Sequence, residues 1–254
     1  MELESYIREK QRQSDILLMT HIVMGYPSFE QCYQIVKTMV SGGANLMELQ
    51  IPFSEPIADG PTILRANQTA LENGVSIRKC LEFAGEITRN FNIPFLVMTY
   101  FNIIFRYGVS RFVEEMARMG LKGTIIADLP PEEAHDYLRA MEDQGLAPIF
   151  LFSPTTSSDR MRYIGSVGKG FIYCVARKGV TGAKTEFSEA LDRYLARCRR
   201  ATTLPLAVGF GVKGRDEVAF LKGKAEIAVI GSQVIRIFER KGIEGIEAFI
   251  RGLR

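Results

Sequence analysis

Two carboxylates, Glu48 and Asp59, lie close together in the sequence and have unlike surroundings. Residues 48–61 read ELQIPFSEPIADGP, so Glu48 stands near the end of an apolar run and Asp59 in a loop broken by three prolines and a glycine. A glutamate in an apolar strand is costly to bury unless it has a partner or a function. Two carboxylates in different environments can hold different protonation states, as general acid and base chemistry requires.

Each carboxylate also has a purely structural interpretation. Glu48 can be a buried glutamate that pairs with a nearby lysine or arginine. Asp59 precedes Gly60, and an aspartate before a glycine is ordinary turn chemistry. Both interpretations stay open until the elements that position the two residues are considered.

The strand that carries Glu48 has two different faces. Alternation places Leu46, Glu48 and Gln50 on one face and Met47, Leu49 and Ile51 on the other. In a closed barrel the wholly apolar face packs against the outer helices. We therefore expect Glu48 to point into the barrel near its mouth.

Short apolar runs alternate with amphipathic helical patterns along the whole chain. Eight runs predict strands, at 16–23, 44–50, 94–99, 123–127, 147–152, 170–174, 205–208 and 227–230. Helical patterns lie between them, at 29–41, 77–90, 109–119, 131–144, 158–167, 186–200 and 215–222, and two more close the chain, at 233–240 and 243–251. This alternation over 254 residues predicts an α/β fold, a (β/α)8 TIM barrel.

The domain organisation follows from the same pattern. No linker divides the chain, so we expect a single domain over residues 1–254, with an extra N-terminal helix at 2–13 that caps the barrel bottom. A doubly wound open sheet is the alternative. The loop after the first strand reads MGYPS at 24–28 and lacks the glycine fingerprint typical of that fold.

The composition argues against several classes of function. A formal net charge of +3 without a basic run argues against binding to nucleic acid or to a membrane surface. The four cysteines lack the spacing of metal ligands and predict reduced, packed thiols. The N-terminus is charged, and no apolar run is long enough to cross a membrane. We expect a cytoplasmic protein without a metal site.

Glycine turns follow the last two predicted strands. The chain reads GFG at 209–211 and GS at 231–232, where a helix is expected to begin. In TIM barrels these two loops commonly bind phosphate through backbone N–H groups and a helix N-terminus. Glycine lets the backbone approach the anion closely, and Ser232 adds a hydroxyl. Each turn is common by itself, but the pair predicts a phosphate site.

Three further features have two interpretations each. The loop RKGVTGAK at 177–184, with three basic residues, can be a mobile lid over an anionic substrate or an exposed connection. Tyr173, on the strand before it, is a core aromatic or a hydroxyl that faces the mouth. Of the two histidines, His135 is expected at the surface, whereas His21 is either a satisfied core histidine or part of a pocket wall.

Motifs along the whole chain resemble those of the tryptophan synthase alpha subunit family. They are GYPS at 25–28, ELQIPFSEPIADGP at 48–61, YFNIIFRYG at 100–108, ADLPPEEA at 127–134, ARKGVTG at 176–182, GFGV at 209–212 and GSQVI at 231–235. The resemblance implies a lyase that cleaves indole-3-glycerol phosphate into indole and glyceraldehyde 3-phosphate by a retro-aldol route.

The resemblance also implies a role for each matching residue. Glu48 would protonate the indole C3 and take the proton of the glycerol hydroxyl, and Asp59 would hold the indole N–H, with Tyr173 beside the site. The predicted phosphate cradle consists of Gly182, Gly211, Gly231 and Ser232. The predicted walls of the indole pocket are His21, Met98, Tyr100 and Phe210, and the predicted lid residues are Arg177 and Thr181.

The resemblance further implies a partner. Members of the family work with a beta subunit that carries pyridoxal phosphate and consumes the indole, which implies an α2β2 heterotetramer. The alpha chain itself is expected to bind no cofactor.

Five positions depart from the family pattern, namely His21 for Phe or Tyr, Met24 for a small residue, Gln50 for glycine, Glu55 for aspartate and Ala176 for serine. Because both carboxylates are intact, we expect lyase activity. Gln50 next to Glu48, together with His21 in the pocket, leaves one alternative: a catalytically weak alpha-like chain that mainly activates its beta partner. Another phosphate-binding barrel, such as an isomerase of histidine or pentose metabolism, would leave the match at 48–61 unexplained.

Overall fold

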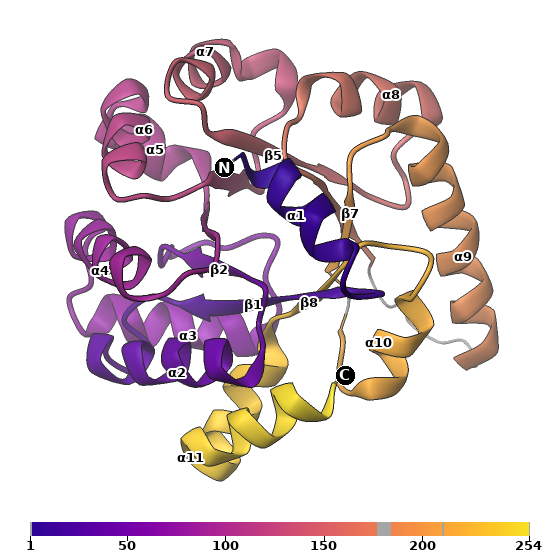
Figure 1. Cartoon of the computed structure of the whole chain (residues 1–254). Helices are drawn as coiled ribbons and strands as arrows, with labels where there is room; N and C mark the ends of the chain where they lie inside the picture. Colours follow the sequence, from indigo (N-terminus) through magenta and orange to yellow (C-terminus); the bar gives the residue numbers. More distant parts are fainter. Residues whose placement is uncertain (1, 177–183, 210, 254) are drawn as a thin grey trace.

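The computed structural model describes residues 2–176, 184–209 and 211–253. Eight strands pair in sequence order, all parallel, and close into a barrel (Figure 1). They are β1 Leu17–Val23, β2 Leu46–Gln50, β3 Phe95–Thr99, β4 Gly123–Ile126, β5 Ala147–Phe152, β6 Ile172–Val175, β7 Leu206–Gly209 and β8 Ile227–Ile230. The predicted (β/α)8 barrel is confirmed, and no strand end differs from its predicted position by more than two residues.

Helices surround the barrel on its outer side, except α1, which lies across one end of it. They are α1 Leu3–Gln11, α2 Phe29–Gly42, α3 Pro61–Glu72, α4 Ile77–Asn90, α5 Phe101–Tyr107, α6 Val109–Arg118, α7 His135–Asp143, α8 Ser158–Val167, α9 Lys184–Ala201, α10 Arg215–Leu221 and α11 Ser232–Gly252, with a 3-10 turn η1 at Pro131–Glu133. The two helices predicted at the end of the chain are the two parts of α11, which breaks at Gly242 with φ 65° and ψ −162°.

Two local details differ from the sequence-based expectation. Helix α5 was not predicted, and its first N–H, at Phe101, is bound by the carboxylate of Asp128 at 2.7 Å, a contact that only the folded barrel supplies. The helix expected at 131–144 starts late, because Ala134 has a non-helical φ of −98° and ψ of 12° and separates η1 from α7.

Side-chain alternation along the strands produces two separate cores. The outer core lies between the strands and the helices and includes Met47, Leu49 and Ile51 of β2. The inner core fills the barrel and consists of Leu17, Met19, Leu46, Leu96, Ile125, Ala147, Ile149, Phe171, Ala207, Ile227 and Val229, joined by two side chains of α1. Leu46 therefore points inward, and by alternation Glu48 and Gln50 do as well.

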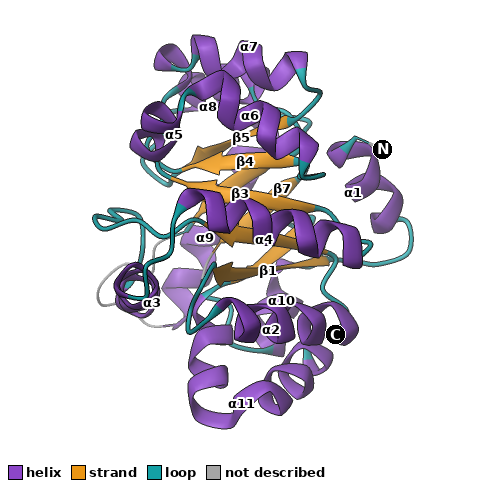
Figure 2. Cartoon of the chain, turned by 90° about the vertical axis from the view of Figure 1, so that its left-hand side faces the viewer, coloured by secondary structure: helices purple, strands orange, loops and turns teal. Residues whose placement is uncertain are grey.

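Helix α1 closes the end of the barrel where the strands begin. Its Leu3 and Ile7 are buried in the inner core, and Tyr6 donates a hydrogen bond from its hydroxyl to the Asn45 carbonyl at 3.0 Å. Figure 1 looks onto this end, and Figure 2 shows from the side that α1 lies at one end of the strands and α3 near the other. The carboxyl ends of the strands are thus left as the mouth of the barrel.

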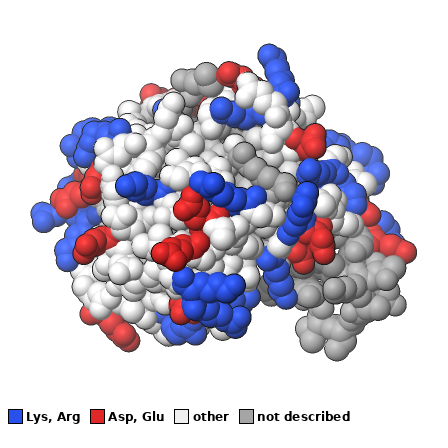
Figure 3. All heavy atoms as spheres, turned by 60° about the horizontal axis from the view of Figure 1, so that its bottom comes forward, with Lys and Arg blue, Asp and Glu red and all other residues white. Residues whose placement is uncertain are grey.

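The surface carries charges of both signs. On the face shown in Figure 3, Lys and Arg side chains alternate with Asp and Glu side chains without forming one basic field. Among the described helices, none is both long enough and apolar enough to cross a membrane.

The role of α1 as the cover of the barrel yields the first prediction. Ile7 is fully buried, so Ile7→Ala leaves a cavity in the inner core and should lower the free energy of unfolding by about 2–5 kcal/mol. Urea unfolding of the variant measures the change, with Ser5→Ala on the exposed side of the same helix as the control. Equal stability of the two variants would contradict the assignment of α1 to the inner core.

Candidate active site

His21 and Glu48 form a buried pair inside the barrel. They are register partners on β1 and β2, and His21 Nδ1 lies 2.9 Å from Glu48 Oε1. Their side chains are 1% and 2% exposed. Within the described residues, Glu48 Oε2 and His21 Nε2 have no hydrogen-bond partner. Each member of the pair therefore keeps one polar atom free inside the barrel.

The electrostatics of this pair favour a charged imidazole. Burial acts to lower the pKa of His21, but the hydrogen bond to Glu48 and the charges of Glu48 and Asp59 outweigh it and raise the pKa above its ordinary value of 6.5. The structural interpretation of Glu48 proposed a lysine or arginine partner. Among the described ion pairs, the partner of Glu48 is His21 instead.

Asp59 is held by two side chains that reach it from the barrel wall. Gln50 Nε2 donates a hydrogen bond to Asp59 Oδ2 at 2.6 Å, and the Tyr100 hydroxyl donates a weak one to the same oxygen at 3.4 Å. Burial raises the pKa of Asp59, although Gln50, His21 and Tyr100 each act to lower it. Gln50, one of the departures from the family pattern, therefore bonds to Asp59.

The loop that carries Asp59 is fixed at several points. The Tyr100 hydroxyl accepts a hydrogen bond from the Ala58 N–H at 3.1 Å, and its ring stacks on Phe53 with a centroid distance of 4.9 Å. Asn67, on α3, accepts a hydrogen bond from the Phe53 N–H at 3.0 Å. Tyr100 thus joins the loop to β3, in addition to its predicted place in the indole pocket.

The start of α3 explains why the loop ends where it does. Pro61 occupies the first position of the helix, where its missing N–H is not needed and its fixed φ suits the helix. The Asp59 N–H bonds to the Pro56 carbonyl at 3.2 Å, so a turn sets Asp59 just before the helix. The turn interpretation of Asp59 is therefore compatible with a chemical role, because the backbone makes the turn while the side chain bonds to Gln50 and Tyr100 of the barrel.

Tyr173 lies on the inner side of β6, packed against the inner core. Burial, followed by the charges of Glu48 and Asp59, raises its pKa well above 10.0, which places the phenol in the same electrostatic environment as the two carboxylates. Its ring lies over Gly209 of β7, where an added Cβ would come within 2.3 Å of the ring. Met98, register partner of Gln50 on β3, also packs against the inner core and is half-buried.

The predicted phosphate residues follow two adjacent strands. Gly211 comes after β7, is exposed and has a φ of +31°, and an added Cβ there would meet nothing within 4 Å among the described residues. Gly231 and Ser232 lie at the start of α11, which has no side-chain cap at its N-terminus. The unbonded N–H groups of a helix N-terminus and the positive end of its dipole favour an anion.

Four predicted site residues, Arg177, Thr181, Gly182 and Phe210, lie outside the described residues. The remaining nine lie on the inner faces of strands or in the segments that follow β2, β3, β7 and β8. Among the described residues there is no group of three or more His, Cys, Asp or Glu side chains that could hold a metal ion.

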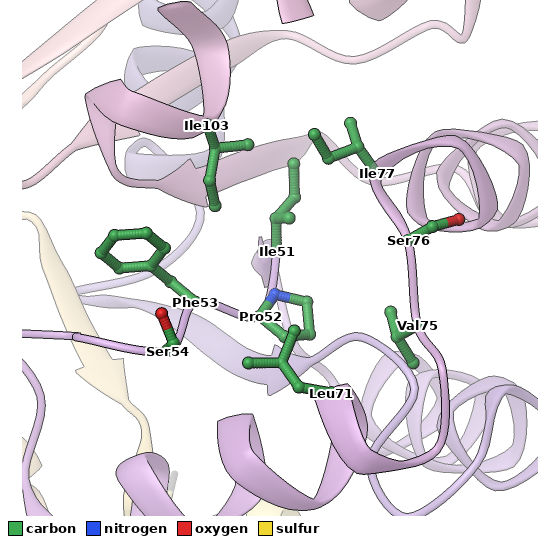
Figure 4. A pocket seen from close by; sticks show the side chains of 9 residues that line it. All are labelled: Ile51, Pro52, Phe53, Ser54, Leu71, Val75, Ser76, Ile77 and Ile103. Carbon is green, nitrogen blue, oxygen red and sulfur yellow. The ribbon is translucent and has the colours of Figure 1, made fainter. Parts of the chain in front are cut away.

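An apolar groove of about 360 Å³ lies outside the barrel wall, behind the loop that carries Asp59. Its lining consists of Ile51, Pro52, Phe53, Ser54, Leu71, Val75, Ser76, Ile77 and Ile103, which Figure 4 shows gathered around Ile51 and Pro52. Phe53 takes part in both places, because its ring lines this groove and stacks on Tyr100.

A closed parallel barrel with two carboxylates and an uncapped helix N-terminus at the carboxyl ends of its strands defines an enzyme of the TIM-barrel class. The profile of the family described as "Tryptophan synthase alpha chain" matches residues 7–251. The chain belongs to this family, whose members are carbon–carbon lyases of tryptophan biosynthesis.

Individual relatives agree with this assignment. A tryptophan synthase alpha chain of Desulforapulum autotrophicum is 61% identical over 251 residues, which covers 99% of both chains. One of Syntrophotalea carbinolica is 58% identical and covers 99% of this chain and 100% of its own. A solved structure of Mycobacterium tuberculosis tryptophan synthase has a TM-score of 0.91 at 31% identity, over 99% of this chain and 96% of that chain.

Sequence reasoning missed two contacts at this site. The sequence shows Gln50 and His21 only as departures from the family pattern. It does not show that Gln50 donates a hydrogen bond to Asp59 or that His21 is the partner of Glu48. For Gln50 the sequence holds a signal, because alternation places Gln50 and Glu48 on the same face of β2. The pairing of β1 with β2, which places His21 beside Glu48, is not encoded in any local pattern.

The raised pKa of Asp59 predicts an unusual stability effect. Its folded pKa lies above the unfolded value of 3.8, so folding favours the protonated form and the ionised form lowers the free energy of unfolding. Asp59→Asn removes this cost and still accepts a hydrogen bond from Gln50. The variant should be more stable than the parent at pH 7, and the gain should disappear as the pH falls through the raised pKa to 3.8.

Urea unfolding at several pH values tests this. Glu55→Gln, which removes an exposed carboxylate from the same loop, is the matched control. An Asp59→Asn variant that is less stable than the parent at pH 7 would show that burial does not dominate the energetics of this carboxylate.

Proposed function

We propose that this chain carries out the alpha reaction of tryptophan synthase through Glu48 and Asp59. In this reaction indole-3-glycerol phosphate is cleaved into indole and glyceraldehyde 3-phosphate. One observation carries the assignment of the two residues: two carboxylates with separate hydrogen-bond partners face the interior of the same barrel at its mouth. A retro-aldol cleavage needs one group that exchanges protons at carbon and oxygen and one anion that stabilises a developing positive charge.

Glu48 is assigned the proton transfers. Its Oε1 is engaged by His21 and its Oε2 is free within the described residues, so one oxygen is positioned and the other is available to the substrate. Glu48 delivers a proton to the indole C3 and accepts the proton of the glycerol hydroxyl, while the bond between C3 and the glycerol carbon breaks. The hydroxyl carbon becomes the aldehyde, and the electrons of the broken bond return to the indole ring.

Asp59 is assigned the stabilisation of the indole ring. Protonation at C3 makes the ring nitrogen positive, and a carboxylate that accepts the indole N–H lowers the energy of that intermediate. Gln50 and Tyr100 hold Asp59 Oδ2, so its other oxygen is the one assigned to the ring nitrogen. Tyr173, whose phenol lies in the field of both carboxylates, is placed beside the reacting carbon.

The remaining site residues are assigned to the phosphate, to the indole ring and to the lid. The phosphate is held at Gly211, Gly231 and Ser232, together with Gly182, and the uncapped start of α11 supports this. The indole ring lies against Met98, Tyr100 and Phe210, with the edge of His21 as a further wall. Arg177 and Thr181 form the lid. The proposed steps use side chains of this chain only, and we assign pyridoxal phosphate to the beta partner.

The proposed function is tested by a substitution that removes the proton exchange at Glu48. Glu48→Gln keeps the shape of the side chain and removes the exchange, so the rate of indole release should fall by at least about 100-fold. Indole release from indole-3-glycerol phosphate is measured for the isolated chain and for the chain mixed with a beta subunit. Glu72→Gln, an exposed glutamate on α3, is the control.

Two outcomes would contradict the proposal. Full activity of the Glu48→Gln variant would refute the mechanism. Absence of indole release by the parent chain, both alone and with the beta subunit, would favour the alternative of a chain that mainly activates its partner.

The apolar groove behind loop 51–54 is proposed as part of the docking site for the beta subunit, in an α2β2 complex. The groove borders the loop that carries Asp59, and two large apolar side chains are exposed, Ile57 of this loop by 74% and Phe105 by 67%. Phe105 lies on α5, the same helix that supplies Ile103 to the groove. Exposed apolar patches next to a groove are typical of protein–protein interfaces.

The proposal also includes the cellular compartment and the kind of molecule that the surface can bind. We assign the chain to the cytoplasm, and the four buried, unpaired cysteines support a reducing compartment. The charges of both signs on the face in Figure 3 form no basic field there of the kind that binds nucleic acid or a membrane.

Placing a charge in the docking surface should weaken association with the beta subunit. Phe105→Asp is expected to raise the Kd by at least about 10-fold, because a carboxylate would be desolvated in the interface. Indole release by the isolated variant should match the parent. Isothermal titration with a beta subunit measures the Kd, and Tyr163→Asp on α8, another exposed aromatic, is the control. Equal Kd values for both variants would place the interface elsewhere.

A further inference from the structure

We propose that His21 is a positioning residue for Glu48, which fixes one carboxylate oxygen and balances the charge of the carboxylate while the other oxygen exchanges protons with the substrate. This inference rests on the proposed function, because it takes Glu48 as the group that moves the protons. It adds a role for a histidine that the sequence placed only in the core or in a pocket wall.

The geometry of the pair carries the argument. His21 Nδ1 contacts Glu48 Oε1 at 2.9 Å, with both residues at matching positions of neighbouring strands in a closed barrel. Neither side chain can turn freely, since both are almost completely buried. The hydrogen bond therefore selects which oxygen of Glu48 is held and which remains free.

The remaining polar atoms of the pair also face the interior. Glu48 Oε2 and His21 Nε2 are both buried and form no hydrogen bond of ordinary length within the described residues. The phenol of Tyr173 is a neighbouring hydrogen-bonding group of Glu48. These two polar atoms on the inner face of the barrel are available to the polar atoms of a substrate.

The groups that face His21 are mostly anionic or neutral. Glu48 and Gln50 face it from β2 and Asp59 from the following loop. Tyr173, on β6, interacts with both carboxylates. The inner face of β8, which pairs with β1, carries the apolar Val229. No described lysine or arginine forms an ion pair with Glu48 or Asp59, and the basic partner of Glu48 is His21, whose pKa the two carboxylates raise.

The cleavage moves two protons through Glu48. Glu48 delivers one proton to the indole C3 and takes the proton of the glycerol hydroxyl as the bond between C3 and the glycerol carbon breaks. The hydrogen bond from His21 holds the other carboxylate oxygen during both transfers. The pair holds the same number of protons before and after the cleavage, so no exchange with water is needed during the step.

Three variants of His21 and its strand test the role in catalysis. His21→Phe removes the hydrogen bond and the charge and should lower kcat by at least about 10-fold, with KM changed by less than about threefold. His21→Asn restores an N–H near the Nδ1 position without the charge and should recover part of kcat. Thr20→Val, whose side chain lies on the opposite face of β1, is the control for disturbance of the strand.

The pH dependence of kcat distinguishes the charge from the hydrogen bond. In the parent, kcat should fall as the pH rises through the raised pKa of His21, whereas the His21→Asn variant should lack this fall. Unchanged kcat in a folded His21→Phe variant would overturn the proposal. Failure of a folded His21→Asn variant to recover any activity would overturn the positioning role as well.

A titration by NMR tests the pair without any activity. The chain has two histidines, so His135→Gln assigns the signals of the imidazole of His21. The pKa of His21 should lie above 6.5 in the parent and should fall in Glu48→Gln, because burial then acts without the carboxylate. The same pKa in both proteins would refute the coupling. A parent that releases no indole contradicts the proposed function, whereas an active parent with unchanged His21→Phe kinetics contradicts the positioning role alone.

Discussion

The buried hydrogen bond between His21 and Glu48 is the interaction on which the mouth of this barrel depends. A carboxylate removed from water loses several kcal/mol of solvation, about the amount that a well-placed ionic partner returns. Because both residues sit on paired strands of a closed sheet, the partner cannot move away. The barrel thus makes a charged group tolerable at a place where the inner core would otherwise be apolar, and leaves one oxygen of that group without a partner among the described residues.

The second carboxylate is held in a different way. Asp59 belongs to a loop, and its position depends on Gln50 and Tyr100, which reach it from β2 and β3. Glu48 is therefore fixed by the sheet and Asp59 by side chains that can rearrange. The same loop forms one wall of the outer groove through Phe53, whose ring stacks on Tyr100. A continuous set of contacts, from the groove through Phe53 and Tyr100 to Asp59, joins the outer surface to the site.

Several residues do more than the sequence suggested. The pattern GFG predicted an anion site, but Gly209 also makes room for the ring of Tyr173, since a Cβ there would lie within 2.3 Å of it. Tyr100 was expected as a pocket wall and also anchors the loop of Asp59. The inward direction of Glu48 was correct, whereas its partner, a histidine rather than a lysine or arginine, was not foreseen.

The sequence by itself determined the barrel, its eight strands, and the strand and loop that carry the two carboxylates, because alternation, helical periodicity and turn chemistry are local. It also determined the family, since its motifs extend over the whole chain. Only the tertiary structure decided which groups meet: His21 with Glu48, Gln50 with Asp59, and Asp128 with the start of α5. These contacts depend on the register between strands and on how loops fold over the mouth. Local sequence patterns do not determine strand register or loop folding, because both bring together residues that are far apart along the chain and that meet only when the sheet closes.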